Sequence, residues 1–449
     1  MMALLLAIIF LSNSVSSALG STAEFSDKKV DPVVESLAKQ RGISAAEAAE
    51  RIAWSEQASK MNDELIEQGA ENFGGIWIDR DTDRVQIGVT GDDLTITGRV
   101  SAYGLSDNVD YVNVKYTFSD LSEKKGDVVK AIKVLSDSLS SNISVGIATD
   151  RNSVAVEIEK EASDNEKSLL KSYLRKYGDM IELNTNGSGV EFASCNWWFC
   201  DSPLRGGVEI ITNPTGWYLY CTAGFGVTGN SGAKYILTAG HCQIDPNSNW
   251  SGTYWYTNDS GYNYKSIGLK HRNVLQEDGD IDAMIIRTTD IGSWSAVGKI
   301  YVRAGIGLGG FSGPSTHEEY DITDYDTSGD LIGSRVCMSG QKSADLNYYE
   351  GGSCGPVLQL ETSLFNMSAG GLTFQLDGIV KANLCARHGD SGGPVFRLGK
   401  ALGIVTAVPS GQNDSAACSV SNAPSSPGIM YYTGLQPIIN AFDNTIHIY

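Results

Sequence analysis

The eight cysteines of this 449-residue chain are confined to its C-terminal part. They all lie between Cys195 and Cys418, whereas residues 21–194 contain none. An even number of cysteines gathered in one segment is typical of a disulfide-stabilised domain that folds outside the cell. No Cys-x-x-Cys or His-x-x-x-His spacing occurs, so we expect no zinc site. The distribution predicts two parts of different fold, with disulfides in the second part.

The composition changes where the cysteines begin. Residues 24–69 are rich in Ala, Glu and Lys, which predicts two helices. Apolar residues alternate with other residues within 75–79 and 85–89, which predicts a β-hairpin. Further alternation of helices and strands predicts an α+β unit, with the elements 127–139, 143–149, 154–158, 165–177 and 180–183. Beyond Gly187, short β-rich runs between Gly, Asn and Ser turns predict an all-β barrel or sandwich, followed by one terminal helix at 436–442.

The N-terminus and the net charge predict where the protein works. Residues 1–11 form an apolar run too short to span a bilayer, and small residues follow it, which predicts a signal peptide at 1–20. The formal net charge of -19 disfavours nucleic acid and anionic membranes as partners, because both repel an acidic surface. We therefore expect a secreted, extracellular monomer that has no membrane contact once the signal peptide is removed.

Residues 389–394 read Gly-Asp-Ser-Gly-Gly-Pro, the most specific motif of the chain. The glycines allow the backbone to turn so that the amides of Gly389 and Ser391 point at one spot, as an oxyanion hole requires. The Ser391 hydroxyl is a weak nucleophile without a neighbouring base. Among five histidines, His241 is the best candidate base, because an apolar strand and a small-residue turn precede it and a cysteine follows it.

The third member of such a site is a carboxylate that holds the imidazole tautomer and stabilises the imidazolium. Asp282 opens an apolar strand pattern and is our choice, with Asp278 and Asp280 as neighbouring alternatives. In isolation, a carboxylate at the start of a strand is more often a solvated turn residue. The Ser391 and His241 motifs together favour the functional interpretation.

Residues 389–393 also satisfy the Gly-x-Ser-x-Gly pattern of the α/β-hydrolases, which is the main structural alternative. That fold requires its catalytic histidine after the serine, and only His447, close to the chain end, follows Ser391. A β-rich segment rather than a helix also follows the motif. The order His241, Asp282, Ser391 instead matches the chymotrypsin arrangement.

On these motifs the chain resembles the bacterial branch of chymotrypsin-like serine proteases, the streptogrisin and α-lytic protease group, whose members are made with a pro-region. The leader segment 73–79 (Phe-Gly-Gly-Ile-Trp-Ile-Asp) is similar to a hairpin of that pro-region. The resemblance implies an all-β catalytic domain of two six-stranded β-barrels with the site between them, preceded by an α+β pro-region. It also implies the disulfides Cys221–Cys242, Cys337–Cys354 and Cys385–Cys418, which leave Cys195 and Cys200 as a local pair.

The resemblance implies a self-processing proenzyme with a signal peptide (1–20), a pro-region (21–189) and a serine protease domain (190–449). The activity would be endopeptidase hydrolysis of protein or peptide substrates through an acyl-enzyme, without metal or organic cofactor. The pro-region would act as folding catalyst and inhibitor, since barrels with mostly non-local strand pairing fold slowly. We expect the strand at 180–183 to dock on the protease and the residues after it to enter the cleft like a product.

Met338 and the segment 406–408 depart from the family pattern. Met338 occupies the place of an arginine that pairs with the aspartate before the nucleophile, so Asp390 needs another partner: Arg387, Arg335 or the new N-terminus. The family's substrate-binding Ser-Gly-Gly edge is replaced by Thr406, Ala407 and Val408. The backbone of this edge can still pair with substrate. Val408 narrows the primary pocket, which favours a small or medium apolar residue before the cleaved bond.

Two other functions remain as alternatives. A catalytically weak homologue could use the barrels as a binding module, and substitution of a triad residue would have favoured it. A serine esterase is the second alternative, because acyl transfer to serine also cleaves esters.

Overall fold

The computed structural model describes residues 31–91, 94–135, 138–187, 190–192, 204–212, 219–244, 253–258, 264–288, 296–303, 317–341, 354–409 and 428–448. Residues 31–449 form one compact unit by their contacts. The expected signal peptide and three cysteines (Cys195, Cys200 and Cys418) lie outside the described residues. In the described part of the chain, no helix is long and apolar enough to cross a membrane.

The structure confirms two N-terminal helices, α1 (Pro32–Arg41) and α2 (Ala45–Glu67). Local signals set their ends. Asp31 accepts a hydrogen bond from the Val33 amide at the start of α1, and Ser44 accepts one from Glu47 at the start of α2. Gly42 adopts the left-handed conformation between them (φ 65°), which glycine reaches without strain.

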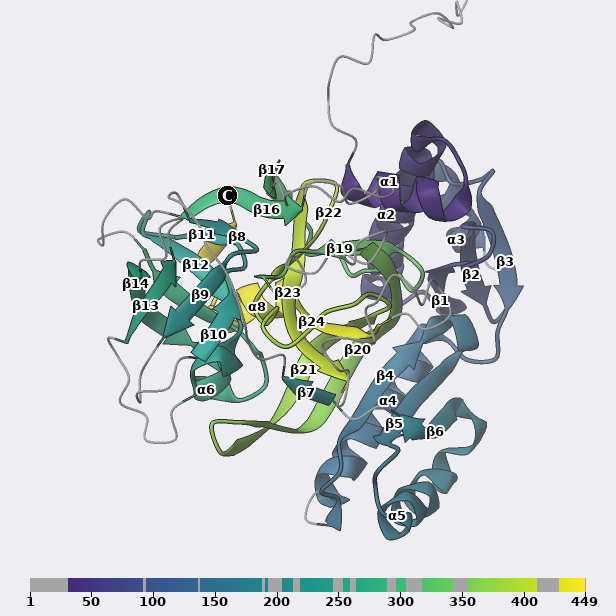
Figure 1. The fold of residues 1–449 in the computed structure, drawn as a ribbon. Coiled ribbons are helices and arrows are strands. Elements are labelled where there is room, and N and C mark those ends of the chain that lie inside the picture. The colour runs from purple at the N-terminus through teal and green to yellow at the C-terminus, as the bar shows by residue number, and fades with distance from the viewer. Residues whose placement is uncertain are drawn as a thin grey trace, which may run out of the picture. The chain divides into compact units, whose positions relative to one another are not determined.

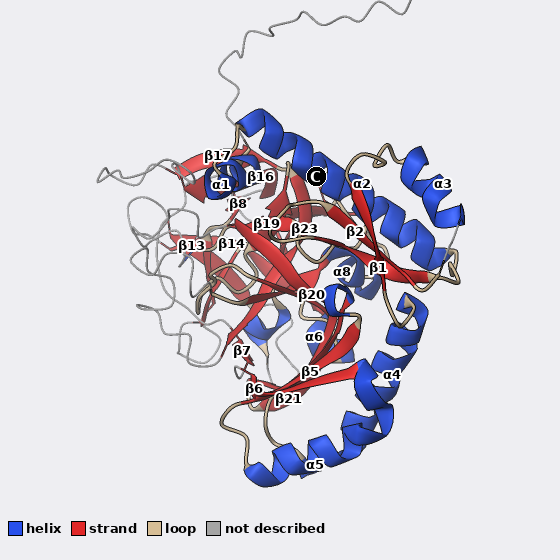
Figure 2. Cartoon of the chain, turned by 90° about the vertical axis from the view of Figure 1, so that its right-hand side faces the viewer, coloured by secondary structure: helices blue, strands red, loops and turns tan. Residues whose placement is uncertain are grey.

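A three-stranded sheet follows, and α2 packs against it (Figure 2). β1 (Phe73–Ile78) and β2 (Val85–Val89) form the expected hairpin, and β3 (Val109–Asn113) pairs with β2 in parallel. The helix between β2 and β3, α3 (Leu94–Ala102), was not expected.

The helix expected at 127–139 is α4 (Phe118–Leu135), which begins a full two turns earlier. Thr117 and Asp120 cap its start reciprocally: the Thr117 amide donates to Asp120 Oδ2 at 3.0 Å, and the Asp120 amide donates to Thr117 Oγ1 at 3.1 Å. This Thr-x-x-Asp cap was readable from the sequence and was missed.

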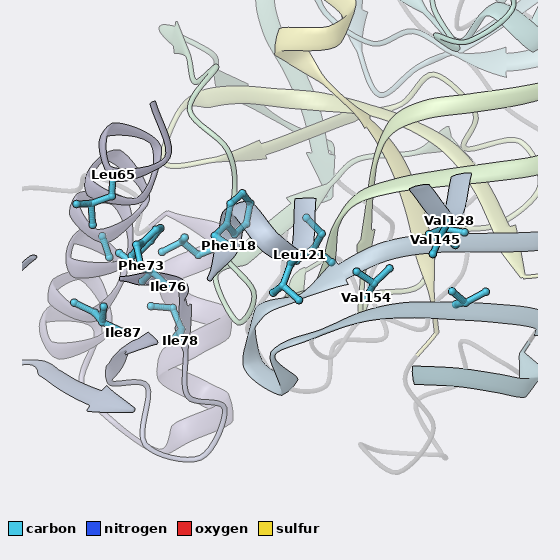
Figure 3. Close-up of a cluster of buried hydrophobic side chains, with 14 of the residues drawn as sticks. Leu65, Phe73, Ile76, Ile78, Ile87, Phe118, Leu121, Val128, Val145 and Val154 are labelled. Atoms are coloured by element: carbon cyan, nitrogen blue, oxygen red, sulfur yellow. The ribbon is translucent and has the colours of Figure 1, made fainter. Parts of the chain in front are cut away.

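The rest of the N-terminal region comprises β4 (Ile143–Ala148), β5 (Ser153–Glu159), α5 (Asp164–Leu174) and β6 (Ile181–Gly187), close to the expected elements. β4 and β5 are antiparallel, and β5 and β6 are parallel. One apolar core joins α2, the small sheet, α4 and these strands. Figure 3 shows part of it, with Leu65, Phe73, Phe118, Leu121, Val145 and Val154 among the labelled side chains.

The first β-barrel is closed by seven paired segments in the order β10-β9-β13-β14-β15-β12-β11. Three residues separate β10 from β11, and within them the Gly224 amide donates to Leu237 O at 2.8 Å, so β10 and β11 act as one bent strand. Six strands therefore make the barrel. Its segments are β9 (Glu209–Thr212), β10 (Leu219–Thr222), β11 (Gly226–Gly229), β12 (Lys234–Thr238), β13 (Tyr254–Asn258), β14 (Tyr264–Asn273) and β15 (Met284–Arg287).

The second barrel runs β19-β22-β23-β24-β21-β20 and closes through pairing of β19 with β20 (Figure 1). Its strands are β19 (Arg335–Met338), β20 (Cys354–Ala369), β21 (Leu372–Ala382), β22 (Pro394–Arg397), β23 (Lys400–Pro409) and β24 (Met430–Gly434). The expected terminal helix is α8 (Leu435–Ala441). Two six-stranded barrels after an α+β region confirm the predicted chymotrypsin-like fold.

Smaller elements complete the described part. They are β7 (Val190–Phe192), β8 (Leu204–Gly206), α6 (Val274–Asp278), β16 (Ala296–Arg303), β17 (His317–Asp321), β18 (Asp324–Tyr325), β25 (Ile446–Ile448) and three 3₁₀ turns, η2 (Thr149–Arg151), η3 (Arg175–Met180) and η4 (Gly240–Gln243).

The strand that docks on the second barrel is β4, and the expectation that residues 180–183 dock there is wrong. β4 pairs antiparallel with β20, with Ile143 opposite Phe365 and Ile147 opposite Leu360, while β6 lies two strands further out. Burial explains the order. Every residue of β4 is buried, as an interior strand requires, whereas β6 alternates exposed and half-buried residues in the manner of an edge.

Candidate active site

His241 and Asp282 meet because the two strands that carry them are neighbours. β12 ends at Thr238, which pairs with Met284 at the start of β15, so the residues just beyond these ends lie together. His241 lies in the turn η4. The Asn273 side chain holds this turn by donating to the carbonyls of Gly240 and Gln243, each at 2.8 Å.

Asp282 holds the imidazole through two hydrogen bonds. Its Oδ2 lies 2.8 Å from His241 Nδ1, and its Oδ1 accepts from the His241 backbone amide at 2.8 Å. The carboxylate is fully buried. With Nδ1–H donating to Asp282, the other ring nitrogen presents a lone pair. Of the two alternative acids, Asp280 is exposed and Asp278 ends α6.

Ser391 completes a hydrogen-bonded chain across the two barrels. Its Oγ lies 2.8 Å from His241 Nε2, although the two residues are 150 positions apart in the sequence. Ser391 is fully buried in this structure. The arrangement brings a hydroxyl, a base and an orienting acid together, which is the geometry of an activated nucleophile.

Glycines are required in the loop that carries Ser391. Gly389 and Gly392 have φ of 108° and 81°, which side chains adopt only with strain. A Cβ at Gly392 would lie 2.0 Å from Thr238 Oγ1, so glycine is also the only residue that fits there. Gly389 and Ser391, whose amides we predict to form the oxyanion hole, bracket Asp390 in this loop.

Asp390 is fully buried and accepts a hydrogen bond from the Arg387 backbone amide at 2.8 Å. The proposal of Arg335 as its partner is wrong, because the Arg335 side chain contacts Ser36 and Gln40 of α1. Met338 packs in an apolar cluster at the position where an arginine was expected. The structure therefore favours the Arg387 segment, through its main chain, as the replacement.

The predicted substrate edge is already paired with the chain itself. β7 runs antiparallel to β23, with Phe192 opposite Ala407 and Glu191 opposite Val408. Thr406, Ala407 and Val408 are fully buried, and the Thr406 hydroxyl lies 2.6 Å from that of Thr433. Val408 packs in one apolar cluster with Ala386 and Met430.

Two disulfides have the pairing that the resemblance implied, Cys221–Cys242 and Cys337–Cys354. Cys385 is also disulfide-bonded, and its expected partner Cys418 lies outside the described residues. The first disulfide ties β10 to the turn that carries His241. Sequence reasoning missed Thr222, which follows Cys221 and reaches the loop of Ser391. The only signal in the sequence that pointed to Thr222 was its position next to Cys221, the expected disulfide partner of Cys242.

Two closed six-stranded barrels with such a serine, histidine and aspartate chain between them define the chymotrypsin-like class of serine proteases. No family model matches the chain. It is 29% identical to serine protease 2 of Streptomyces fradiae over 186 residues, which is 41% of this chain and 85% of that protein. It is 28% identical to streptogrisin-A of Streptomyces griseus over 46% of this chain, and 24% identical to streptogrisin-C of the same organism over 54%.

These relatives make the chain similar to the streptogrisin group of serine proteases. The matches span 52% and 41% of the lengths of streptogrisin-A and streptogrisin-C. Among solved structures, a Nocardiopsis protease is 21% identical, with a TM-score of 0.36, over 55% of this chain and 99% of that one. Protease A of Thermobifida fusca is 19% identical, also with a TM-score of 0.36, over 55% and 98%.

Proposed function

We propose that the protein is a secreted serine endopeptidase that is made as a self-processing proenzyme. The observation that carries this proposal is the hydrogen-bonded chain from Ser391 through His241 to the buried Asp282. The named relatives, serine protease 2 and the streptogrisins, support the reaction class.

Ser391 Oγ attacks the carbonyl carbon of the scissile bond while His241 Nε2 takes its proton, so the oxygen charge develops on the carbonyl. The amides of Gly389 and Ser391 stabilise that charge. His241 then gives the proton to the leaving amine, which leaves an acyl-enzyme. Water, deprotonated by the same imidazole, then attacks the ester, and the imidazolium returns the proton to Ser391 Oγ as the acid product leaves. Asp282 holds the ring orientation and stabilises its positive charge throughout.

The first test combines a serine-reactive phosphonate with a peptide library. We expect labelling of Ser391 and cleavage of peptides, with a preference for a small or medium apolar residue before the cut because Val408 and Met430 fill the adjoining cluster.

Asp282→Asn should reduce kcat by about 10⁴-fold, since it removes the acceptor for Nδ1–H. Asp280→Asn is the matched control, an exposed carboxylate two residues away.

Absence of labelling would disprove the serine mechanism and favour a binding module. Labelling with ester turnover but no peptide cleavage would favour the esterase alternative. An equal effect of the two aspartate variants would disprove the role of Asp282.

We further propose that residues 21–189 act as template and inhibitor of the protease domain. Beyond the pairing of β4 with β20, apolar residues of α1 and α2 (Val33, Leu37 and Ile52) pack in one cluster with Phe396 and Ala401 of the second barrel. Charges are complementary as well. Glu157 lies 2.8 Å from Lys381, and Glu56 lies 3.4 Å from Lys400. β7 (Val190–Phe192) directly follows this region and pairs with the substrate edge, which supports inhibition by occupancy as long as the chain is uncut.

This docking should weaken as the pH rises. Burial against the barrel, opposed by a hydrogen bond from the Gly329 amide (3.0 Å) and reinforced by the charges of Asp326 and Glu67, raises the pKa of Asp63 on α2 to about 7. An undocked aspartate titrates near 3.8. The protonated form is therefore favoured in the docked state. Docking is strongest at acidic pH, weakens between about pH 4 and 7, and stays weak above that. Burial raises the pKa of Asp31 in the same direction.

We expect the cleaved but still associated N-terminal region to dissociate roughly 10-fold more readily at pH 8 than at pH 5. Asp63→Asn imitates the protonated carboxyl and should flatten this dependence, with tighter association at pH 8. Asp324→Asn, which removes an exposed carboxylate near the same loop, is the control. Gel filtration of the processed complex at both pH values measures the effect. Equal pH dependence in all three proteins would contradict it.

A further inference from the structure

We propose that Thr222 is a positioning residue that locks the two peptide planes on either side of the peptide that carries the Ser391 amide, an inference that rests on the proposed serine protease activity. Thr222 is the last residue of β10 in the first barrel, whereas the loop belongs to the second barrel. It is fully buried. Its side chain and its main chain both bond to the loop.

The side-chain bond fixes the peptide between Gly389 and Asp390. Thr222 Oγ1 donates to Gly389 O at 2.6 Å, and the amide end of the same peptide, Asp390 N, donates to Arg387 O at 3.0 Å. Glycine permits rotation of its peptide that a side chain would forbid. Because Gly389 has φ of 108°, local sterics do not lock this plane, and the hydroxyl bond supplies the restraint.

The main-chain bond fixes the peptide after Ser391. The Thr222 amide donates to Ser391 O at 2.8 Å, and Gly392 N donates to Val405 O at 2.8 Å. Thr222 therefore holds the planes on both sides of the one that carries the Ser391 amide. Since both oxyanion donors are predicted to come from this loop, a small rotation of either plane would move a donor away from the developing charge.

Thr222 is itself held rigidly. Thr238 Oγ1 donates to Thr222 O at 2.9 Å, and the amide of Gln341 donates to Thr222 Oγ1 at 3.2 Å. Its neighbour Cys221 is bonded to Cys242, which adjoins His241. One short segment of the first barrel thus positions both the base and, across the barrel boundary, the loop of the nucleophile.

The test compares Thr222→Val, Thr222→Ser and Thr212→Val in the full-length chain. Valine keeps the shape and the backbone amide but loses the hydroxyl bond, whereas serine keeps the bond. Thr212→Val is matched, because the buried Thr212 also donates to a backbone carbonyl, Tyr254 O at 3.1 Å, in the same barrel. The readouts are kcat and KM on an amide substrate, the rate of phosphonate labelling, the melting temperature, and hydrogen exchange of the peptide that contains Ser391.

We expect Thr222→Val to lower kcat and the labelling rate by about 10- to 100-fold with KM changed by less than about twofold, and to speed exchange in the loop. Thr222→Ser should stay within about threefold of the parent, and Thr212→Val should lower only the melting temperature. If Thr222→Val fails to fold, Thr222→Ala is compared with Thr222→Ser instead. These two variants differ only in the hydroxyl group, and both lack the methyl group of threonine.

Equal kinetics of Thr222→Val and Thr212→Val, or a change in KM alone, would overturn the inference and leave the proposed activity intact. A parent chain that neither labels nor cleaves peptides would overturn the activity and this role together. Faster hydrogen exchange of the Ser391 peptide in Thr222→Val without any loss of kcat would mean that Thr222 has only a structural role, and this result would also overturn the inference.

Discussion

Ser391→Ala is expected to lower peptide hydrolysis by about 10⁴- to 10⁶-fold and to leave the chain uncut. Ser391 Oγ is the atom that His241 Nε2 contacts at 2.8 Å, and alanine has no group there that can attack a carbonyl. Any residual rate would come from substrate binding and the loop amides alone. The fold should be unchanged, because alanine removes only one oxygen atom.

The same variant tests self-processing. β7, which pairs with the substrate edge, ends at Phe192, and the first strand after it, β8, begins at Leu204. We therefore expect the parent chain to be cut between these residues, which mass spectrometry and N-terminal sequencing of the mature protein would show. Purified Ser391→Ala should remain full-length and should be cut when active parent enzyme is added.

Ser266→Ala is the matched control for this experiment, because it removes a buried hydroxyl from β14 of the first barrel, away from the site. It should process normally. Cleavage of purified Ser391→Ala without added enzyme would contradict self-processing. Substantial peptide hydrolysis by that variant would contradict the serine mechanism.

Removal of residues 21–189 is expected to slow recovery of active protease by roughly 100-fold or more, with recovery restored when the region is added as a separate chain. Both barrels contain pairings between strands distant in the sequence, such as β9 with β13 and β21 with β24, and such folds form slowly. β4 presents a fully buried strand to β20, so the N-terminal region can hold the long β20–β21 hairpin in register while the barrel closes.

A pair of asparagines allows a milder test at the same surface. Asn142 Nδ2 donates to Asn366 O at 3.2 Å, and Asn366 Nδ2 donates to Ser141 O at 2.8 Å. Asn366→Gly removes the amide and tolerates the φ of 61° at this position. Combined with Asn142→Ala, it should lower the yield of active protein without changing kcat of the molecules that fold. Fast recovery of full activity by residues 190–449 alone would contradict the template role.

The N-terminal region illustrates what a sequence can and cannot indicate. Most of its helices and strands, α3 excepted, were predictable because capping residues and apolar periodicity act between neighbours in the chain. α4 was placed too late only because the cap at Thr117 was overlooked. The docking strand was misassigned for a different reason: pairing of β4 rather than β6 with β20 depends on which strand is buried on both faces after the whole sheet has assembled.

The candidate site likewise combines features that the sequence predicts with features that only the tertiary structure decides. The motifs around His241 and Ser391, and their order with Asp282, are properties of the sequence itself, and they predict the reaction class and the chymotrypsin-like fold. The sequence alone determined which residue types are present and which chemistry they can support. Tertiary structure decided that Asp282 contacts the imidazole, that the main chain of Arg387 bonds Asp390 while Arg335 contacts α1, and that Thr222 reaches the nucleophile loop. These contacts join segments far apart in the chain, and strand register and close packing, which no local motif encodes, set their geometry.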